Sequence, residues 1–130
     1  MKLEFRQLSL FMLFACTLLL LASCSEEDKS LRFEGESDNW KSQYFLTQDK
    51  DRETGEGSII YKGSNKDNIG EVTYKIEGNY GSIDKTSTPV DGKMSINDAC
   101  EGCAKQDSSE PFHVTIKWDG KTEEFDLKAK

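Results

Sequence analysis

The sharpest chemical feature of the sequence is Cys100-Glu101-Gly102-Cys103, in which two thiols are separated by two residues. This spacing suits three kinds of chemistry: a structural disulfide, catalytic thiol exchange, or the binding of a metal such as zinc. A disulfide is the expectation for an exported domain, because oxidising compartments preserve disulfides. Its short loop would stabilise the fold modestly, by about 2 kcal/mol.

The residues around the pair give little support to the other two chemistries. Thiol exchange needs a cysteine pKa lowered by a helix N-terminus or a nearby cation. Residues 104–109 show no helical apolar pattern before Pro111, and the carboxylate of Glu101 disfavours a thiolate. A zinc site needs two further ligands, and the one histidine is His113. We expect no metal and no cofactor.

His113 lies between Phe112 and Val114, so in an extended strand its side chain faces away from theirs. We expect an ordinary solvent-facing histidine rather than a metal ligand or a catalytic base. The nucleophile motif Gly-x-Ser-x-Gly does not occur in the sequence. These observations predict a protein that is not an enzyme and has no catalytic residues.

Residues 49–55, Asp-Lys-Asp-Arg-Glu-Thr-Gly, resemble the start of a calcium-binding loop in the spacing of their acidic side chains. Thr54, however, replaces the turn glycine, and Ile60 stands where the bidentate glutamate belongs. We therefore expect the solvated tip of a hairpin at this point.

The N-terminal residues have the layout of an export signal. Lys2 and Arg6 give the first residues a positive charge, and an apolar run follows from Leu8 to Leu21. This run is short for a membrane-spanning helix, which needs about 20 apolar residues. It matches the apolar region of a cleaved signal peptide in length and in its flanks.

The segment Leu21-Ala22-Ser23-Cys24 resembles the lipobox of bacterial lipoproteins. The resemblance implies removal of residues 1–23 as a signal peptide and transfer of diacylglycerol to the thiol of Cys24, often with a further acyl chain. Two or three acyl chains hold a protein stably on a membrane. Residues 24–30 would then be a lipidated, acidic and polar tether on the extracytoplasmic face of the cell membrane, with membrane lipid as its partner.

The chain is acidic, with 24 Asp and Glu against 17 Lys and Arg and a net charge of −7. Nucleic-acid binding needs a basic stripe that replaces phosphate counterions, and the sequence has none. We therefore expect no nucleic-acid partner. The partners that remain open are a cell-envelope protein and a small-molecule ligand.

Residues 31–130 read as one domain of short strands separated by Gly, Asn and Asp. The clearest strands are Glu71 to Glu77 and Phe112 to Trp118, where apolar and polar side chains alternate. Asp119-Gly120 then predicts a type I′ turn before Phe125 and Leu127 return. Weaker strands are expected at Leu31 to Glu34, Trp40 to Thr47, Gly57 to Lys62, Tyr80 to Lys85 and Lys93 to Asn97.

Seven or eight strands in this length favour an all-β fold, a small antiparallel β-sandwich of immunoglobulin-like type, with a small β-barrel as the alternative. Most of the large aromatic residues should lie in the core, because they alternate with polar residues at strand spacing. These residues are Trp40, Tyr44, Tyr61, Tyr74, Tyr80 and Trp118.

The domain also resembles a group of small lipoproteins of Bacillus-like Gram-positive bacteria. The residues that carry this resemblance are Glu34-Gly35-Glu36-Ser37-Asp38-Asn39-Trp40-Lys41, Tyr61-Lys62-Gly63, Gly70-Glu71-Val72 and Ile116-Lys117-Trp118-Asp119-Gly120-Lys121-Thr122-Glu123. The resemblance implies location and fold but no activity. The sequence thus favours a membrane-anchored, non-catalytic binding or accessory module. The alternative is a thiol-redox or metal-binding lipoprotein that uses Cys100 and Cys103.

Overall fold

The computed structural model describes residues 7–9, 12–15 and 28–130. Residues 7–9 and 12–15 are helical, and no helix among the described residues is long and apolar enough to cross a membrane. The expected lipidation site, Cys24, and most of the expected signal peptide and tether lie outside the described residues.

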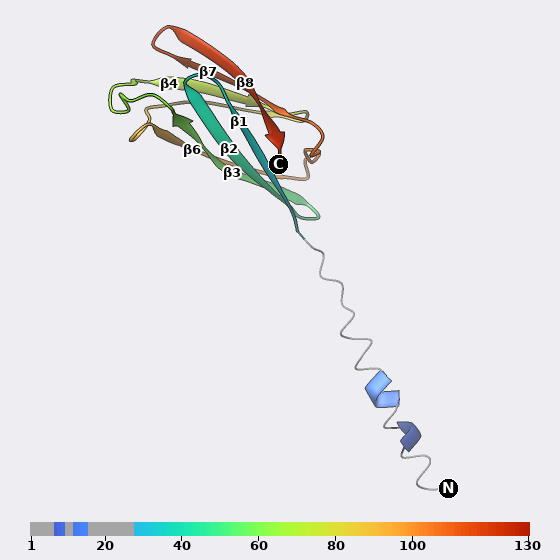
Figure 1. The fold of residues 1–130 in the computed structure, drawn as a ribbon. Helices are drawn as coiled ribbons and strands as arrows, with labels where there is room; N and C mark the ends of the chain where they lie inside the picture. Colours follow the sequence, from blue (N-terminus) through green and yellow to red (C-terminus); the bar gives the residue numbers. More distant parts are fainter. Residues whose placement is uncertain (1–6, 10–11, 16–27) are drawn as a thin grey trace.

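Eight antiparallel strands form one sheet with the order β5-β4-β7-β8-β1-β2-β3-β6 (Figure 1). The predicted all-β fold with seven or eight strands is confirmed. The strands are β1 (Lys29–Glu36), β2 (Trp40–Gln48), β3 (Arg52–Tyr61), β4 (Val72–Glu77), β5 (Ser82–Ser87), β6 (Lys93–Glu101), β7 (Phe112–Trp118) and β8 (Lys121–Ala129).

The sheet is a nearly closed barrel, which is the alternative that the sequence left open, rather than the β-sandwich that it favoured. Its two halves, β1-β2-β3-β6 and β5-β4-β7-β8, are continuous only where β1 pairs with β8, at Phe33 with Ala129 and at Glu34 with Lys128. At the other end of the order, β5 and β6 are the sheet edges, and the Lys85 ammonium donates to the Asn97 carbonyl, 3.3 Å away. The alternation of inward and outward side chains is the same in a sandwich, so it could not separate the two arrangements.

The core is built from the inward-facing residues of every strand. In β2 the side chains alternate strictly between buried and exposed, from Trp40 to Gln48. Trp40 is fully buried, and its ring packs edge to face on Trp118 with ring centroids 5.4 Å apart. The inward residues of β7 are Phe112, Val114, Ile116 and Trp118, as predicted.

The β7–β8 turn is the predicted two-residue turn. Asp119 and Gly120 have φ values of 45° and 70°, and Trp118 pairs with Lys121. Positive φ at both central residues is the signature of the type I′ turn, which matches the twist of the strands it joins.

Three strands are longer than the sequence suggested. β1 begins at Lys29 rather than Leu31, inside the expected tether. β3 begins at Arg52 rather than Gly57, since strand pairing continues through its glycines, and β6 runs on to Glu101. Glycine and acidic residues have low strand propensity, so these extensions depend on pairing with neighbouring strands, which the local pattern does not report.

The seam between the two halves depends on a close backbone approach. A Cβ at Gly35 of β1 would collide with the carbonyl oxygen of Asp126 in β8. Further along the seam, the carboxylate of Glu123 accepts hydrogen bonds from Ser37 Oγ at 2.6 Å and from the Asn39 backbone and side-chain amides at 2.9 and 2.6 Å. Burial acts to raise the pKa of Glu123, but these hydrogen bonds outweigh it and lower the pKa below its ordinary value.

Replacing Gly35 by alanine should therefore open the seam. We expect Gly35→Ala to lower the free energy of unfolding by about 2 kcal/mol or more, because backbone rather than a movable side chain opposes the new methyl group. Gly81→Ala is the matched control, since a Cβ there meets nothing within 4 Å. Urea unfolding followed by tryptophan fluorescence measures both, and equal stability of the two variants would contradict the role of Gly35.

Candidate functional site

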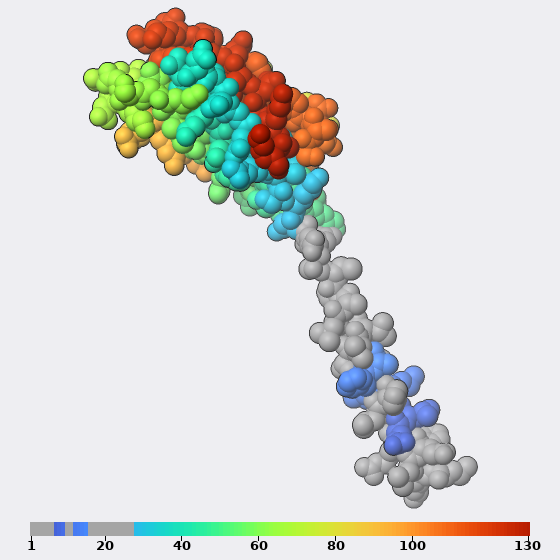
Figure 2. All heavy atoms as spheres, viewed as in Figure 1, coloured from blue at the N-terminus to red at the C-terminus, as the bar shows by residue number. Residues whose placement is uncertain are grey.

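The strand register gathers polar residues at the end of the barrel where β1 begins. Four residues form one row across four strands, through the pairs Lys29 with Gln48, Gln48 with Glu53, and Glu53 with Cys100. The segment that follows β6, orange in Figure 2, lies on this side of the domain. The row therefore brings Cys100 beside a carboxylate that is far from it in the sequence.

A cavity of about 230 Å³ lies between the two halves of the sheet at this end. Both halves contribute to its walls, and Cys100 and Cys103 line its rim. The lining residues are Tyr44, Glu53, Ile76, Gly78, Tyr80, Gly81, Ser82, Ile83, Asp98, Ala99, Cys100, Cys103, Ala104, Gln106 and Phe112.

Tyr44 of β2 presents its hydroxyl to this cavity. The residue is 3% exposed, and its hydroxyl lies directly over Gly55 of β3, where any side chain would collide with it. Among the described residues, none forms a hydrogen bond with this hydroxyl. Burial raises the pKa of Tyr44 well above its ordinary value, and the negative charges of Asp98 and Glu53 raise it further. The phenol is thus a neutral polar group on a nearly buried side chain, with hydrogen-bonding capacity that no described residue uses.

Glu53 is held in place by two glutamines. One of its oxygens, Oε2, accepts hydrogen bonds from Gln48 Nε2 at 2.6 Å and from the Gln106 backbone amide at 3.1 Å. Gln106 is 4% exposed, and its side chain also accepts from the Asn79 backbone amide and donates to the Glu110 carbonyl. The other oxygen of Glu53 has no hydrogen bond to the described part of the chain.

Asp98 supplies a second carboxylate to the cavity. It is the cross-strand partner of Gly55, two residues along β6 from Cys100, the partner of Glu53. Diagonal neighbours of this kind on one sheet face lie roughly 7–8 Å apart at Cα, within reach of one small ligand. The Asp98 carboxylate forms no hydrogen bond among the described residues, and the cavity lining includes no Lys, Arg or His.

Cys100 and Cys103 lie at disulfide distance, with Cα atoms 5.8 Å apart. Cys100 is at the end of the edge strand β6, not at a helix N-terminus, and Glu53 and Asp98 share its cavity. Nearby carboxylates oppose a thiolate, so the surroundings lack the features that lower a cysteine pKa. Within the ranges the structure describes, no group of three His, Cys, Asp or Glu residues could hold a metal ion.

His113 lies on the outer face of β7, away from Phe112, as the strand pattern predicted. Its Nδ1 is 2.8 Å from Asp126 Oδ1, and its Nε2 is 3.5 Å from Glu124 Oε1. The hydrogen bond with Asp126 raises the pKa of His113; burial opposes this effect, and the smaller contribution of Glu124 adds to it. When it is protonated, His113 forms an ion pair with Asp126 at the protein surface.

The remaining candidates from the sequence, the acidic segment 49–55 and most of the aromatic residues, have structural roles in the turn and in the core. The tip of the β2–β3 hairpin is the expected turn, in which Asp49 Oδ1 accepts hydrogen bonds from the backbone amides of Asp51 and Arg52 at 3.0 and 2.7 Å. Of the six aromatic residues expected mostly in the core, four are buried and Tyr61 is partly buried. Tyr80 is 63% exposed, at the mouth of the end cavity.

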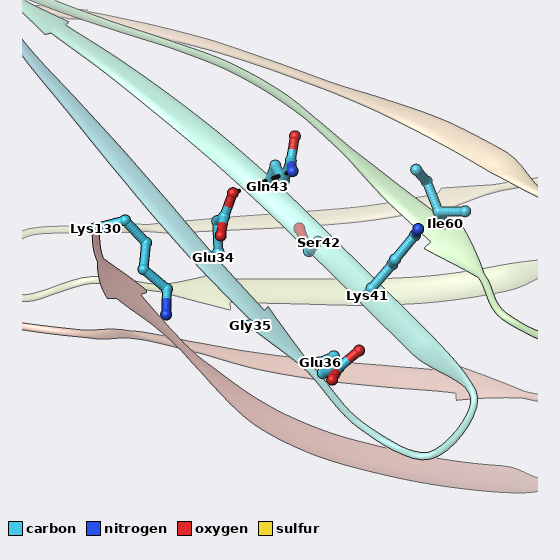
Figure 3. A pocket seen from close by; sticks show the side chains of 8 residues that line it. All are labelled: Glu34, Gly35, Glu36, Lys41, Ser42, Gln43, Ile60 and Lys130. Atoms are coloured by element: carbon cyan, nitrogen blue, oxygen red, sulfur yellow. Dashed lines mark hydrogen bonds between the residues drawn. The ribbon is translucent and has the colours of Figure 1, made fainter.

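A second hollow lies on the outside of β1 and β2 (Figure 3). Its carboxylates already have partners, because Glu34 accepts a hydrogen bond from Gln43 at 3.1 Å and Glu36 pairs with Lys62 at 3.2 Å. Of the three buried polar residues among those described, Ser42, Gln48 and Gln106, only Ser42 lines this hollow. Its hydroxyl already donates a hydrogen bond to the Ser58 carbonyl. The end cavity is the stronger candidate site.

Sequence reasoning singled out Cys100 and Cys103 but missed Tyr44, Glu53 and Asp98 as a group. The sequence pattern places Glu53 at a hairpin tip and Tyr44 in the core. One signal was available: Gly55 lies in a run that pairs as a strand, and glycine inside a strand often marks a close approach by another group.

No family model, curated protein or solved structure matches this chain.

The pairing of His113 predicts a pH dependence. Because its pKa is raised in the folded state, protonated His113 contributes stability below pH about 6.5, and the contribution is lost as pH rises through the raised pKa. The stability difference between the native protein and His113→Gln should thus shrink with increasing pH. An NMR titration of the imidazole should show a lower pKa in Asp126→Asn and no change in Glu56→Gln; an unchanged pKa in Asp126→Asn would refute the pairing.

Proposed function

We propose that this chain is a lipid-anchored extracytoplasmic lipoprotein whose domain binds a small ligand in the end cavity without transforming it. The observation that carries the binding function is Tyr44, a residue 3% exposed whose hydroxyl faces the cavity with no hydrogen-bond partner among the described residues. The hydroxyl belongs to a nearly buried side chain but is open to the cavity, so a bound ligand can use a hydrogen-bonding capacity that no described residue uses.

The shape of the site also supports binding. The cavity joins apolar walls, from Ile76, Ile83 and Phe112, to a few convergent polar groups. This combination is typical of ligand sites in proteins, as is the position at the mouth of a β-barrel. At about 230 Å³ the cavity suits a ligand smaller than a typical drug.

The anchor is supported by the sequence. The charged N-terminus, the apolar run and the segment from Leu21 to Cys24 occur in the order that lipoprotein export needs. A cavity-bearing domain held at the membrane fits a role as a binding or accessory module of the cell envelope.

A thiol-redox function is the second candidate, because Cys100 and Cys103 line the same cavity. The carboxylates beside them weigh against it, since they disfavour the thiolate that exchange requires. Replacing both cysteines by serine separates the two functions. Ligand binding should survive the replacement, whereas a redox function would be lost.

Blocking the cavity tests the binding function. Ala104 is exposed and lines the cavity rim, so Ala104→Trp should fill the mouth without disturbing the core. Small molecules extracted from the cell envelope should raise the melting temperature of the native protein, because a ligand that binds only the folded state stabilises it. They should not do so in Ala104→Trp. Thr88→Trp, at an exposed site outside the cavity, is the control. An equal shift in Ala104→Trp would contradict the proposed site.

Removing the lipidated thiol tests the anchor. Cys24→Ala should shift the protein out of the membrane fraction or block its processing, because diacylglycerol has no other acceptor in the lipobox. Cys16→Ala is the matched control, since Cys16 belongs to the apolar run. Fractionation and intact mass of the mature protein measure the outcome. A processed Cys24→Ala protein that remains in the membrane fraction would refute the anchor.

A further inference from the structure

We infer that the end cavity binds a primary ammonium group carried on a short apolar or aromatic chain. The inference rests on the proposed binding function and names the class of ligand.

The charge of the cavity selects a cation. Two carboxylates, Glu53 and Asp98, line it, and no basic residue does. Two lysines near this end donate to carbonyls outside the lining: Lys85 to Asn97 and Lys105, which lies between the lining residues Ala104 and Gln106, to Asp49. Lys29 is in the same row of strand pairs as Glu53 but is not part of the lining. An anionic ligand would face repulsion from both carboxylates in a partly enclosed site, where charge interactions are stronger than in water.

The acceptors suit a primary ammonium. Such a group has three N–H donors, and the cavity offers three oxygen groups without a described partner: the Tyr44 hydroxyl, the second oxygen of Glu53, and the Asp98 carboxylate. The neutral phenol can accept from the ammonium and donate to a carboxylate at the same time. A quaternary ammonium has no N–H and would leave these oxygens unsatisfied.

A divalent metal ion is a poorer match. Calcium takes six to eight oxygen ligands and magnesium requires near-octahedral geometry, whereas two carboxylates from two strands provide fewer contacts. No group of three acidic, His or Cys residues capable of holding a metal is present in the described part of the chain.

The remaining walls describe the rest of the ligand. Ile76, Ile83 and Phe112 are buried at their sheet positions and give the cavity an apolar side, and the exposed ring of Tyr80 stands at the mouth. A ligand with an ammonium at one end and a short hydrocarbon or aromatic part at the other would fill both regions.

The ammonium could be free in solution or belong to a lipid head group. The proposed lipid on Cys24 is five residues from Lys29, the first residue of β1 and a member of the row that ends at Cys100. Five extended residues span at most about 17 Å. The cavity end of the domain is therefore held near the membrane surface, where ethanolamine head groups present primary ammonium groups.

A set of matched probes tests the charge selection on the full lipoprotein in detergent. We expect 2-phenylethylamine to bind, and 2-phenylethanol and 3-phenylpropionate to bind at least about tenfold more weakly, as measured by NMR shifts of cavity residues. Asp98→Asn should weaken amine binding about tenfold. Asp84→Asn, at an exposed site on β5 outside the cavity, should leave it unchanged. Tyr44→Phe removes only the hydroxyl and should also weaken binding.

The outcomes separate this inference from the proposed function. If the alcohol binds as tightly as the amine, or if Asp98→Asn binds the amine as well as the native protein, the ammonium inference is overturned while the binding function stands. If no probe binds but envelope extract still stabilises the native protein and not Ala104→Trp, the inference is again overturned alone. If neither probes nor extract act, both fail.

Vesicles then distinguish the two sources. The lipoprotein is inserted into phosphatidylcholine vesicles with or without phosphatidylethanolamine, and the affinity for 2-phenylethylamine is measured. A head group that occupies the cavity should weaken the probe's apparent affinity only in vesicles containing phosphatidylethanolamine. Equal affinity in both, with selectivity for the amine retained, supports a soluble amine.

Discussion

The pairing of β1 with β8 is the contact on which the rest of the structure depends. It joins the halves of the sheet through few backbone pairs, and it is possible because Gly35 carries no side chain where the Asp126 carbonyl approaches. Glu123 extends the seam by binding Ser37 and Asn39 beyond the last paired residues. The halves can then face each other and bury one continuous core, and the cavity is the space left between them at one end.

The cavity exists because that end of the barrel is built from residues with little strand propensity. Gly55 gives space to the Tyr44 hydroxyl, and the inward positions beyond the last apolar residues of β3 and β6 are Glu53 and Asp98. A barrel optimised for stability would place apolar side chains there. Such local departures from the pattern of a well-packed core are where functional sites are expected.

Much of the fold follows from the sequence. Strands such as β4 and β7 alternate apolar and polar residues, and Asp119-Gly120 requires positive φ, so local physics determines both the strands and the turn. The closure of the barrel does not follow, because it depends on which edges meet across long sequence separations. The same reason applies to the site: Tyr44, Glu53 and Asp98 are brought together by register between strands, and no local pattern around any one of them records its neighbours.

Gln106 has a consequence for the thermodynamics of binding. Its backbone amide fixes Glu53, and its side chain joins the β4–β5 turn to the segment before β7, so the carboxylate is oriented before any ligand arrives. The conformational entropy of that side chain is lost on folding and not on association. A ligand of the proposed site would therefore meet a preorganised charge, and its affinity would reflect the contacts it makes rather than the ordering of the protein.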